Sequence, residues 1–234
     1  MPKERLDKQL ASTGRWSRSE VKRLVREGRV LVDGRVAVSA EEKCDAESAS
    51  ITVDSEAVCL RQFVYVMLNK PAGVLSATED GQGRTVLDLL PREYQKRGLF
   101  PVGRLDKDTE GLLLLTDDGS LAHDLLSPKK HVDKLYFARV EGALDDADCV
   151  AFAEGMTLGD GLHCLPAVLR IVAPDEALVT LHEGKFHQIK RMFAARGKPV
   201  VYLKRLAMGP LTLDEGLTPG EWRELTDAEE KMLK

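Results

Sequence analysis

Apolar positions near the start of the chain follow the spacing of a short helix and a hairpin. Residues 17–28 open with a Ser and Glu capping box, carry apolar residues at i, i+3 and i+4, and end at a glycine. The apolar runs 30–32 and 36–38 flank an Asp-Gly pair, which is typical of a hairpin turn. A further strand is predicted at 51–53. These elements predict a small helix-hairpin domain over residues 1–57.

A second apolar system begins after residues 56–62, which lack periodicity and are interpreted as a linker. Residues 63–68 predict a buried strand that ends in the turn Asn69-Lys70-Pro71-Ala72-Gly73. Further predicted strands are 112–116, 135–141, 169–172, 177–182 and 200–203. Predicted helices are 85–90, 120–126, 145–154 and 187–196. No regular βαβ period or glycine-rich phosphate loop is present, so the fold class is α+β, with a mixed, largely antiparallel sheet over residues 63–234.

Composition limits the class of protein. The 234 residues are 43% hydrophobic and 31% charged, as in an ordinary soluble protein. No apolar run approaches the roughly 20 residues of a membrane span, and the charged start does not fit a secretory signal, so we expect a cytoplasmic location and no membrane partner. The four cysteines form no C-x-x-C pair and no two histidines have metal spacing, which favours neither a disulfide framework nor a metal site. We expect a monomer.

Charge is distributed unevenly. The net charge is -4, yet the first 35 residues contain ten Lys or Arg and only five Asp or Glu. Such a helix surface is often no more than a solvated face. Alternatively it binds phosphates without reading sequence. The basic residues proposed to contact RNA are Arg15, Arg18, Lys22, Arg23 and Arg26.

Residues 3–55 resemble the S-four family of RNA-binding modules. The matching segments are Arg5-Leu6-Asp7-Lys8 with Leu10, Ser17-Arg18-Ser19, Gly28-Arg29-Val30 and Val32-Asp33-Gly34. The resemblance implies binding to structured RNA.

The most informative chemistry lies at Asp106, between Gly103 and Gly111. The two glycines allow sharp turns on either side of this carboxylate, and the apolar run 112–115 places it at the edge of a core. By composition alone, a loop of solvated charges is the usual explanation. In the helix predicted at 187–196, an apolar stripe keeps Lys190 close to apolar surface.

Several segments together resemble the RsuA-like pseudouridine synthases, which modify ribosomal RNA and carry an S-four module before the catalytic domain. In order, they are Asn69-Lys70-Pro71-Ala72-Gly73, Gly103-Arg104-Leu105-Asp106 with Asp108-Thr109 and Gly111-Leu112, Lys134 with Tyr136, His187-Gln188-Ile189-Lys190-Arg191-Met192, and Pro219-Gly220-Glu221. This likeness extends over nearly the whole chain.

The resemblance implies roles for individual residues. Asp106 matches the catalytic aspartate, Tyr136 the tyrosine packed against the target base, and Lys190 the basic residue that pairs with the aspartate. Arg104 matches an arginine that helps occupy the space left by the extruded base, and Leu203 an apolar residue of the base pocket. Lys70 is also expected to contact substrate. Many synthases outside this branch have arginine where Lys190 stands, and a lysine pairs as a point charge without a bidentate fork.

The chemistry itself explains these residue types. Forming pseudouridine breaks the N1–C1′ bond of uridine, turns the uracil and joins C5 to C1′, so no cofactor is required. An ionised Asp106 either attacks C1′ or takes a proton from C2′, and a nearby Lys190 cation stabilises its charge. The target uridine must first leave the base stack.

We therefore predict an enzyme that isomerises a uridine of ribosomal RNA, free or in an assembling subunit, with the small subunit favoured. The alternatives are the same reaction on large-subunit RNA, or an RNA-binding or ribosome-assembly protein without activity. A glycosidase that uses Asp106 and Asp108 is less favoured, because two positions apart on a loop is no recognisable acid and base spacing.

Overall fold

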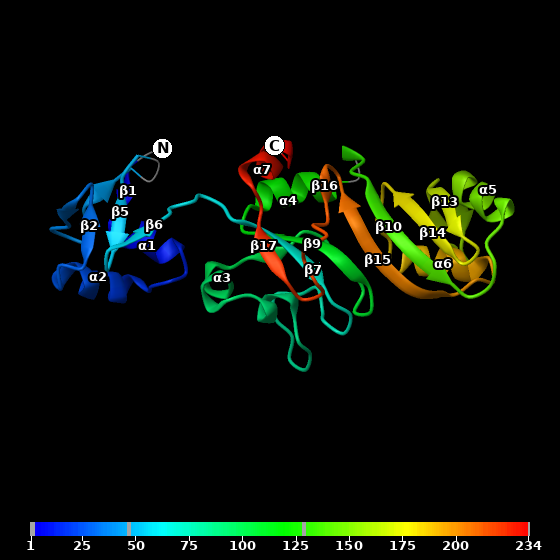
Figure 1. The fold of residues 1–234 in the computed structure, drawn as a ribbon, viewed down its shortest axis with the longest axis horizontal. Coiled ribbons are helices and arrows are strands. Elements are labelled where there is room, and N and C mark those ends of the chain that lie inside the picture. Colours follow the sequence, from blue (N-terminus) through cyan, green and yellow to red (C-terminus); the bar gives the residue numbers. More distant parts are fainter. Residues whose placement is uncertain (1–2, 46–47, 128–129, 234) are drawn as a thin grey trace. The chain divides into compact units, whose positions relative to one another are not determined.

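The fold is described from a computed structural model, which covers residues 3–45, 48–127 and 130–233 (Figure 1). Contacts divide the chain into two compact units. The first comprises residues 1–64 and 90–99, and the second comprises residues 65–89 and 100–234. The boundary expected between residues 57 and 63 remains a prediction.

The first unit combines short helices with a four-stranded sheet of order β3-β2-β5-β6. Its elements are β1 (Glu4–Arg5), α1 (Leu6–Ser12), α2 (Arg18–Arg26), β2 (Val30–Val32), β3 (Arg35–Val36), β4 (Lys43–Cys44), β5 (Ile51–Val53), β6 (Glu56–Val58) and α3 (Arg92–Arg97). The helix, the hairpin and the third strand predicted from the sequence are all present. The interpretation of 56–62 as a linker is wrong in part, because residues 56–58 form β6 and pair with β5.

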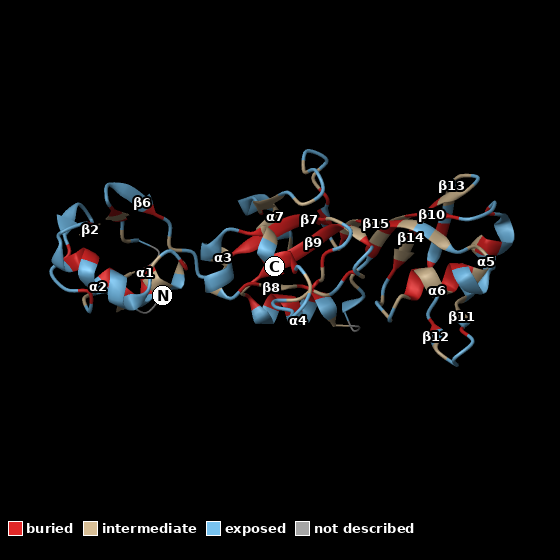
Figure 2. Ribbon diagram, turned by 90° about the horizontal axis from the view of Figure 1, so that it is seen from below, coloured by how far each residue is buried: buried red, intermediate tan, exposed pale blue. Residues whose placement is uncertain are grey.

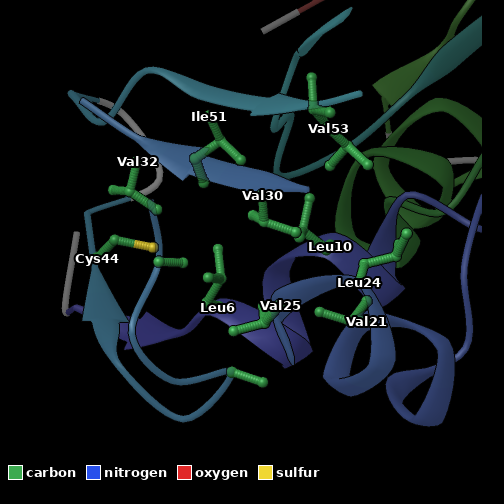
Figure 3. Close-up of a cluster of buried hydrophobic side chains, with 13 residues drawn as sticks. Leu6, Leu10, Val21, Leu24, Val25, Val30, Val32, Cys44, Ile51 and Val53 are labelled. Carbon is green, nitrogen blue, oxygen red and sulfur yellow. The ribbon is translucent and has the colours of Figure 1, made fainter. Parts of the chain in front are cut away.

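Local chemistry explains the ends of α2 and the hairpin turn. Ser17 and Glu20 form the predicted capping box at the start of the helix. Asp33 and Gly34 both have positive φ, at 51° and 77°, as a two-residue hairpin turn requires. One face of α2 packs into an apolar cluster, and its opposite face stays exposed. Figure 3 shows that cluster, in which side chains from α1, α2, β2 and β5 meet.

The second unit is built on a nine-stranded sheet. Its main path runs β13-β14-β10-β15-β9-β7-β17, with β16 paired to β15 and β8 paired to β9. The strands are β7 (Tyr65–Lys70), β8 (Phe100–Pro101), β9 (Glu110–Thr116), β10 (Lys134–Val140), β13 (Val168–Ala173), β14 (Glu176–Leu181), β15 (Val200–Met208), β16 (Leu211–Thr212) and β17 (Trp222–Glu224). All described pairs are antiparallel except β9 with β15, which confirms the mixed, largely antiparallel sheet.

The remaining elements are helices and one small strand pair. They are η1 (Val86–Leu89), α4 (Gly119–Leu126), α5 (Asp146–Glu154), β11 (Met156–Thr157), β12 (His163–Cys164), α6 (Gln188–Ala195) and α7 (Asp227–Leu233). The centre of the sheet is its most buried part: every residue of β7 is buried, and in β9 only the first is not (Figure 2). Within the described ranges, no helix is both long and apolar enough to cross a membrane.

A glycine permits the close approach of β9 to β15. Gly111 pairs with Arg205 in the parallel register and has φ of 101°. A Cβ at this position would lie 2.2 Å from the Arg205 carbonyl oxygen, which no side chain could tolerate. Glycine is therefore required where the loop carrying Asp106 enters the sheet.

Candidate active site

Asp106 lies in the loop between β8 and β9. The loop turns at Gly103, with φ of 78°, and the Asp106 carbonyl accepts a hydrogen bond of 3.1 Å from the Thr109 amide. Ser76 holds the preceding residue on both sides: its Oγ donates to the Leu105 carbonyl at 2.9 Å and accepts from the Leu105 amide at 3.1 Å. These hydrogen bonds fix the backbone on both sides of the Asp106 carboxylate.

Lys70, at the end of β7, holds the same loop from beneath. Its side chain is completely buried, and Nζ lies within hydrogen-bond distance of the carbonyl oxygens of Asp106 (3.0 Å), Lys107 (3.2 Å), Thr109 (2.8 Å) and Pro71 (3.1 Å). Burial lowers its pKa to about 8, against the partial opposition of nearby carboxylates. The expectation that Lys70 contacts substrate is wrong, because the ammonium is enclosed by backbone oxygens and has no exposed surface.

Lys190, from the first turn of α6, pairs with the carboxylate. Its Nζ lies 3.1 Å from Asp106 Oδ2 and 2.5 Å from Asp108 Oδ1, so one ammonium serves two carboxylates. The hydrogen bond from Lys190 holds the pKa of Asp108 below its ordinary value, although partial desolvation opposes this. Asp106 is 26% exposed and Asp108 is 75% exposed, so Asp106 is the carboxylate that is set into the protein.

His187 approaches the other oxygen of Asp106, a contact that we did not predict from the sequence. His187 Nε2 lies 3.5 Å from Asp106 Oδ1. The residue precedes α6 and has left-handed backbone angles, φ 50° and ψ 32°, which cost a non-glycine residue of order 1 kcal/mol. From the sequence we assigned His187 no role of its own beyond its place in the matching segment. In the sequence, only the His-Gln pair at the start of the α6 segment could have marked His187 as a site residue.

A pocket opens beside Asp106. Its polar lining includes Thr109 and Gln188, and its apolar lining includes Leu105, Leu181 and Ile189. The same pocket is also lined by Arg104, Asp106, Tyr136, His187 and Leu203. The pocket lining is therefore mixed, with polar and charged side chains beside the apolar ones.

Two adjacent strands, one loop and one helix bring these side chains together. Tyr136 lies on β10 and is 8% exposed, and Leu203 lies on the adjacent β15 and is 5% exposed. Arg104 is exposed on the loop that carries Asp106. Four predicted residues, Asp106, Tyr136, Arg104 and Leu203, thus line one pocket, and Lys190 contacts the first of them. In the described part of the chain, no group of three or more His, Cys, Asp or Glu side chains has the arrangement of a metal site.

The basic residues predicted to bind RNA lie in and before α2. Val21, Leu24 and Val25 of this helix are buried, so its basic residues face solvent. Several have carboxylate neighbours: Arg15 pairs with Glu56 at 3.0 Å, Lys22 with Glu41 at 4.0 Å and Arg23 with Glu27 at 3.8 Å. Exposed pairs of this kind contribute about 0–1 kcal/mol each, so phosphates can compete for these side chains.

Comparison with known proteins identifies the class. The family model described as RNA pseudouridylate synthase matches residues 64–195, and the S4 domain model matches residues 4–48. The first of these ranges covers more than half of the chain and contains the loop of Asp106, Tyr136 and Lys190. The chain belongs to the RNA pseudouridine synthase family, and its N-terminal unit contains an S4 domain.

Individual relatives agree with this assignment. An uncharacterized RNA pseudouridine synthase of Bacillus subtilis is 48% identical over 98% of both chains. The ribosomal small subunit pseudouridine synthase A of Vibrio cholerae is 41% identical, over 96% of this chain and 97% of its own. A crystal structure of a pseudouridylate synthase, 36% identical, superimposes with a TM-score of 0.69 and covers 99% of this chain and 100% of the other.

Proposed function

We propose that the protein isomerises a uridine of small-subunit ribosomal RNA to pseudouridine, with Asp106 as the catalytic carboxylate. The observation that carries this proposal is the contact between Lys190 Nζ and Asp106 Oδ2, 3.1 Å, at a pocket also lined by Tyr136 and Leu203. The choice of RNA rests on full-length relatives named as ribosomal small subunit pseudouridine synthase A, in Vibrio cholerae and Escherichia coli.

Each pocket residue has a part in the reaction. The carboxylate of Asp106 either attacks C1′ or takes the proton from C2′. Lys190 places its positive charge beside this carboxylate, and Tyr136 and Leu203 pack against the detached uracil while it turns. The N1–C1′ bond breaks, the C5–C1′ bond forms, and the proton lost from C5 is balanced by the proton gained at N1. Arg104, exposed at the mouth of the pocket, occupies the space that the extruded base leaves in the RNA.

The S4 domain supplies affinity for the RNA. Arg15, Arg18, Lys22, Arg23 and Arg26 contact phosphates, which fixes the position of the substrate without reading its sequence. These contacts help to offset the few kcal/mol that extruding a base costs. The substrate is free RNA or an assembling subunit, and the enzyme acts as a monomer in the cytoplasm.

Asp106→Asn tests the catalytic assignment. This change removes the ionised oxygen while keeping the size of the side chain. We expect no pseudouridine in a transcript of the small-subunit RNA, and an RNA dissociation constant within about twofold of the wild type. Asp108→Asn is the matched control, because Asp108 contacts the same ammonium but is 75% exposed, and it should retain most activity. Product in excess over enzyme with Asp106→Asn would refute the assignment.

Mapping pseudouridine in cells that lack the protein tests the choice of RNA. Loss of one site in small-subunit RNA is expected. Loss in large-subunit RNA instead would support the alternative substrate, and an unchanged map together with retained RNA binding would support a binding or assembly protein without activity.

A further inference from the structure

Phe186 exposes a large aromatic ring beside the pocket. The residue is 74% exposed, and it is the one exposed Phe, Tyr or Trp among the residues that the structure describes. The residues on either side, Lys185 and His187, both line the pocket. The ring is therefore at the rim of the site, where RNA that delivers a uridine to Asp106 must pass.

The ring is supported on one face. Phe186 and His187 are stacked, with ring centroids 3.8 Å apart and planes inclined by 19°. His187 in turn lies next to the proposed catalytic carboxylate, with its Nε2 3.5 Å from Asp106 Oδ1. One face of Phe186 is thus occupied by a ring that contacts the catalytic carboxylate, and the other face is free for a planar ligand.

The loop that carries Phe186 is also held in place. Gln188 is buried; its Oε1 accepts from the Lys185 amide at 3.0 Å and its Nε2 donates to Glu183 Oε1 at 2.6 Å. Glu183 in turn accepts from the Leu165 amide at 2.9 Å and pairs with the Lys185 ammonium at 3.0 Å. These hydrogen bonds and this ion pair hold the backbone on both sides of Phe186. The exposed position of the ring is therefore set by an ordered loop.

We propose that Phe186 is a stacking platform for the unpaired base next to the target uridine. Extruding the uridine leaves its neighbour without a stacking partner, and an aromatic ring at the rim replaces that partner. This inference rests on the proposed function, because the occupant is the RNA that the pocket acts on.

The test separates stacking from simple apolar burial. Phe186→Leu keeps an apolar side chain without a π-face, and Phe186→Tyr keeps the ring. We expect Phe186→Leu to raise KM for the small-subunit transcript about tenfold, within the range of base–aromatic stacking, with kcat within twofold. Phe186→Tyr should keep the wild-type KM. Val168→Ala, at another exposed apolar position, 61% exposed on β13, is the control and should change neither constant.

A binding measurement keeps the test independent of turnover. Short single-stranded oligoribonucleotides carry 2-aminopurine on the 5′ or the 3′ side of a uridine. Fluorescence quenched on binding by wild-type protein and Phe186→Tyr, and not by Phe186→Leu, supports the platform even if no product forms. Equal quenching by Phe186→Leu, an unchanged KM, or a fall in kcat alone would overturn it. Absence of product with the wild-type enzyme refutes the proposed RNA substrate and leaves the quenching result to decide on Phe186.

Discussion

Replacing Lys70 with Met should uncouple the loop of Asp106 from the sheet. The wild-type ammonium has three protons, and all its acceptors are backbone carbonyls. Losing a hydrogen bond to a charged group costs about 1.5–3 kcal/mol, so three cost roughly 4.5–9 kcal/mol. Against this stands the cost of keeping the charge buried: a pKa lowered from 10.5 to about 8 corresponds to about 3 kcal/mol.

The difference leaves a net loss of roughly 1.5–6 kcal/mol, and a loss of about 3 kcal/mol is a representative value within that range. For a chain of this length, that loss lowers Tm by about 6–12 °C. Displacing a catalytic group by about 1 Å costs up to roughly 100-fold, so kcat should fall by a similar factor for the folded variant. Calorimetry measures the first effect, and single-turnover kinetics on RNA, well below Tm, measures the second.

A matched control separates loop position from stability. Lys198 pairs with Asp145 at 3.1 Å and with the buried Asp148, which also pairs with Arg196. Lys198→Met should therefore lower Tm as well, because it removes one partner of a buried carboxylate. It should leave kcat unchanged, since none of these residues lines the pocket.

The pH dependence gives a second signature of Lys70. Below pH 8 the folded and unfolded chains both carry the proton. Between about pH 8 and 10.5 only the unfolded chain retains it, so this lysine makes the free energy of unfolding rise with pH in that window. The neutral amine has one hydrogen-bond donor fewer for the loop, so wild-type kcat should fall above pH 8. Over the same window, the contribution of Lys70 to the free energy of unfolding does not fall. Two results would refute this reasoning: a Lys70→Met variant with the kcat and Tm of the wild type, or a Lys70→Met variant whose kcat falls above pH 8 as the wild type's does.

Two further changes test the pairing of the carboxylate and the basic surface. Lys190→Met should lower kcat about 100-fold in single-turnover assays, because Asp106 loses its cation while Asp108 remains nearby. Lys190→Arg keeps the charge and should retain activity within about tenfold. Wild-type activity of the Met variant would contradict the ion-pair role. Changing Arg18 and Lys22 together to Gln should weaken RNA binding. Titrations from about 50 to 200 mM salt should show the slope of log K against log salt reduced by about 0.7–0.9 for each phosphate that is no longer neutralised. An unchanged slope would mean that this face of α2 takes no part in RNA recognition.

Local signals made much of the fold predictable. The capping box and apolar spacing of α2 and the Asp-Gly turn act within a few residues, so they were read correctly from the sequence. Helix α1 was not predicted, because Asp7 and Gln9 interrupt its apolar pattern. Both are buried by distant or local partners: Asp7 pairs with Arg5, and Gln9 donates to the Cys44 carbonyl at 2.8 Å. Helix α7 buries no residue and therefore has no apolar stripe to detect.

Strand β15 shows the same limit within the catalytic sheet. Its predicted part, 200–203, ended where the charged residues Lys204 and Arg205 begin, yet the strand continues to Met208. Arg205 is 2% exposed, and its Nε donates to the Leu112 carbonyl of β9 at 2.7 Å. A buried arginine is acceptable there because a neighbouring strand supplies an acceptor, and that partner is 93 residues away in the chain.

The position of the Asp106 carboxylate depends on contacts of two kinds, which explains what could and could not be predicted from the sequence. Side-chain partners have a recognisable type, so the resemblance of these segments to those of the RsuA-like pseudouridine synthases was enough to predict the contact of Asp106 with Lys190. Backbone partners have none: Lys70 donates to carbonyl oxygens, which every residue has, so nothing in residues 106–109 marks them as acceptors. Lys70 therefore resembled a substrate-binding lysine until the fold enclosed it. A charged side chain near an active site can hold the backbone or contact the substrate. The two roles are told apart by whether the folded protein buries that side chain.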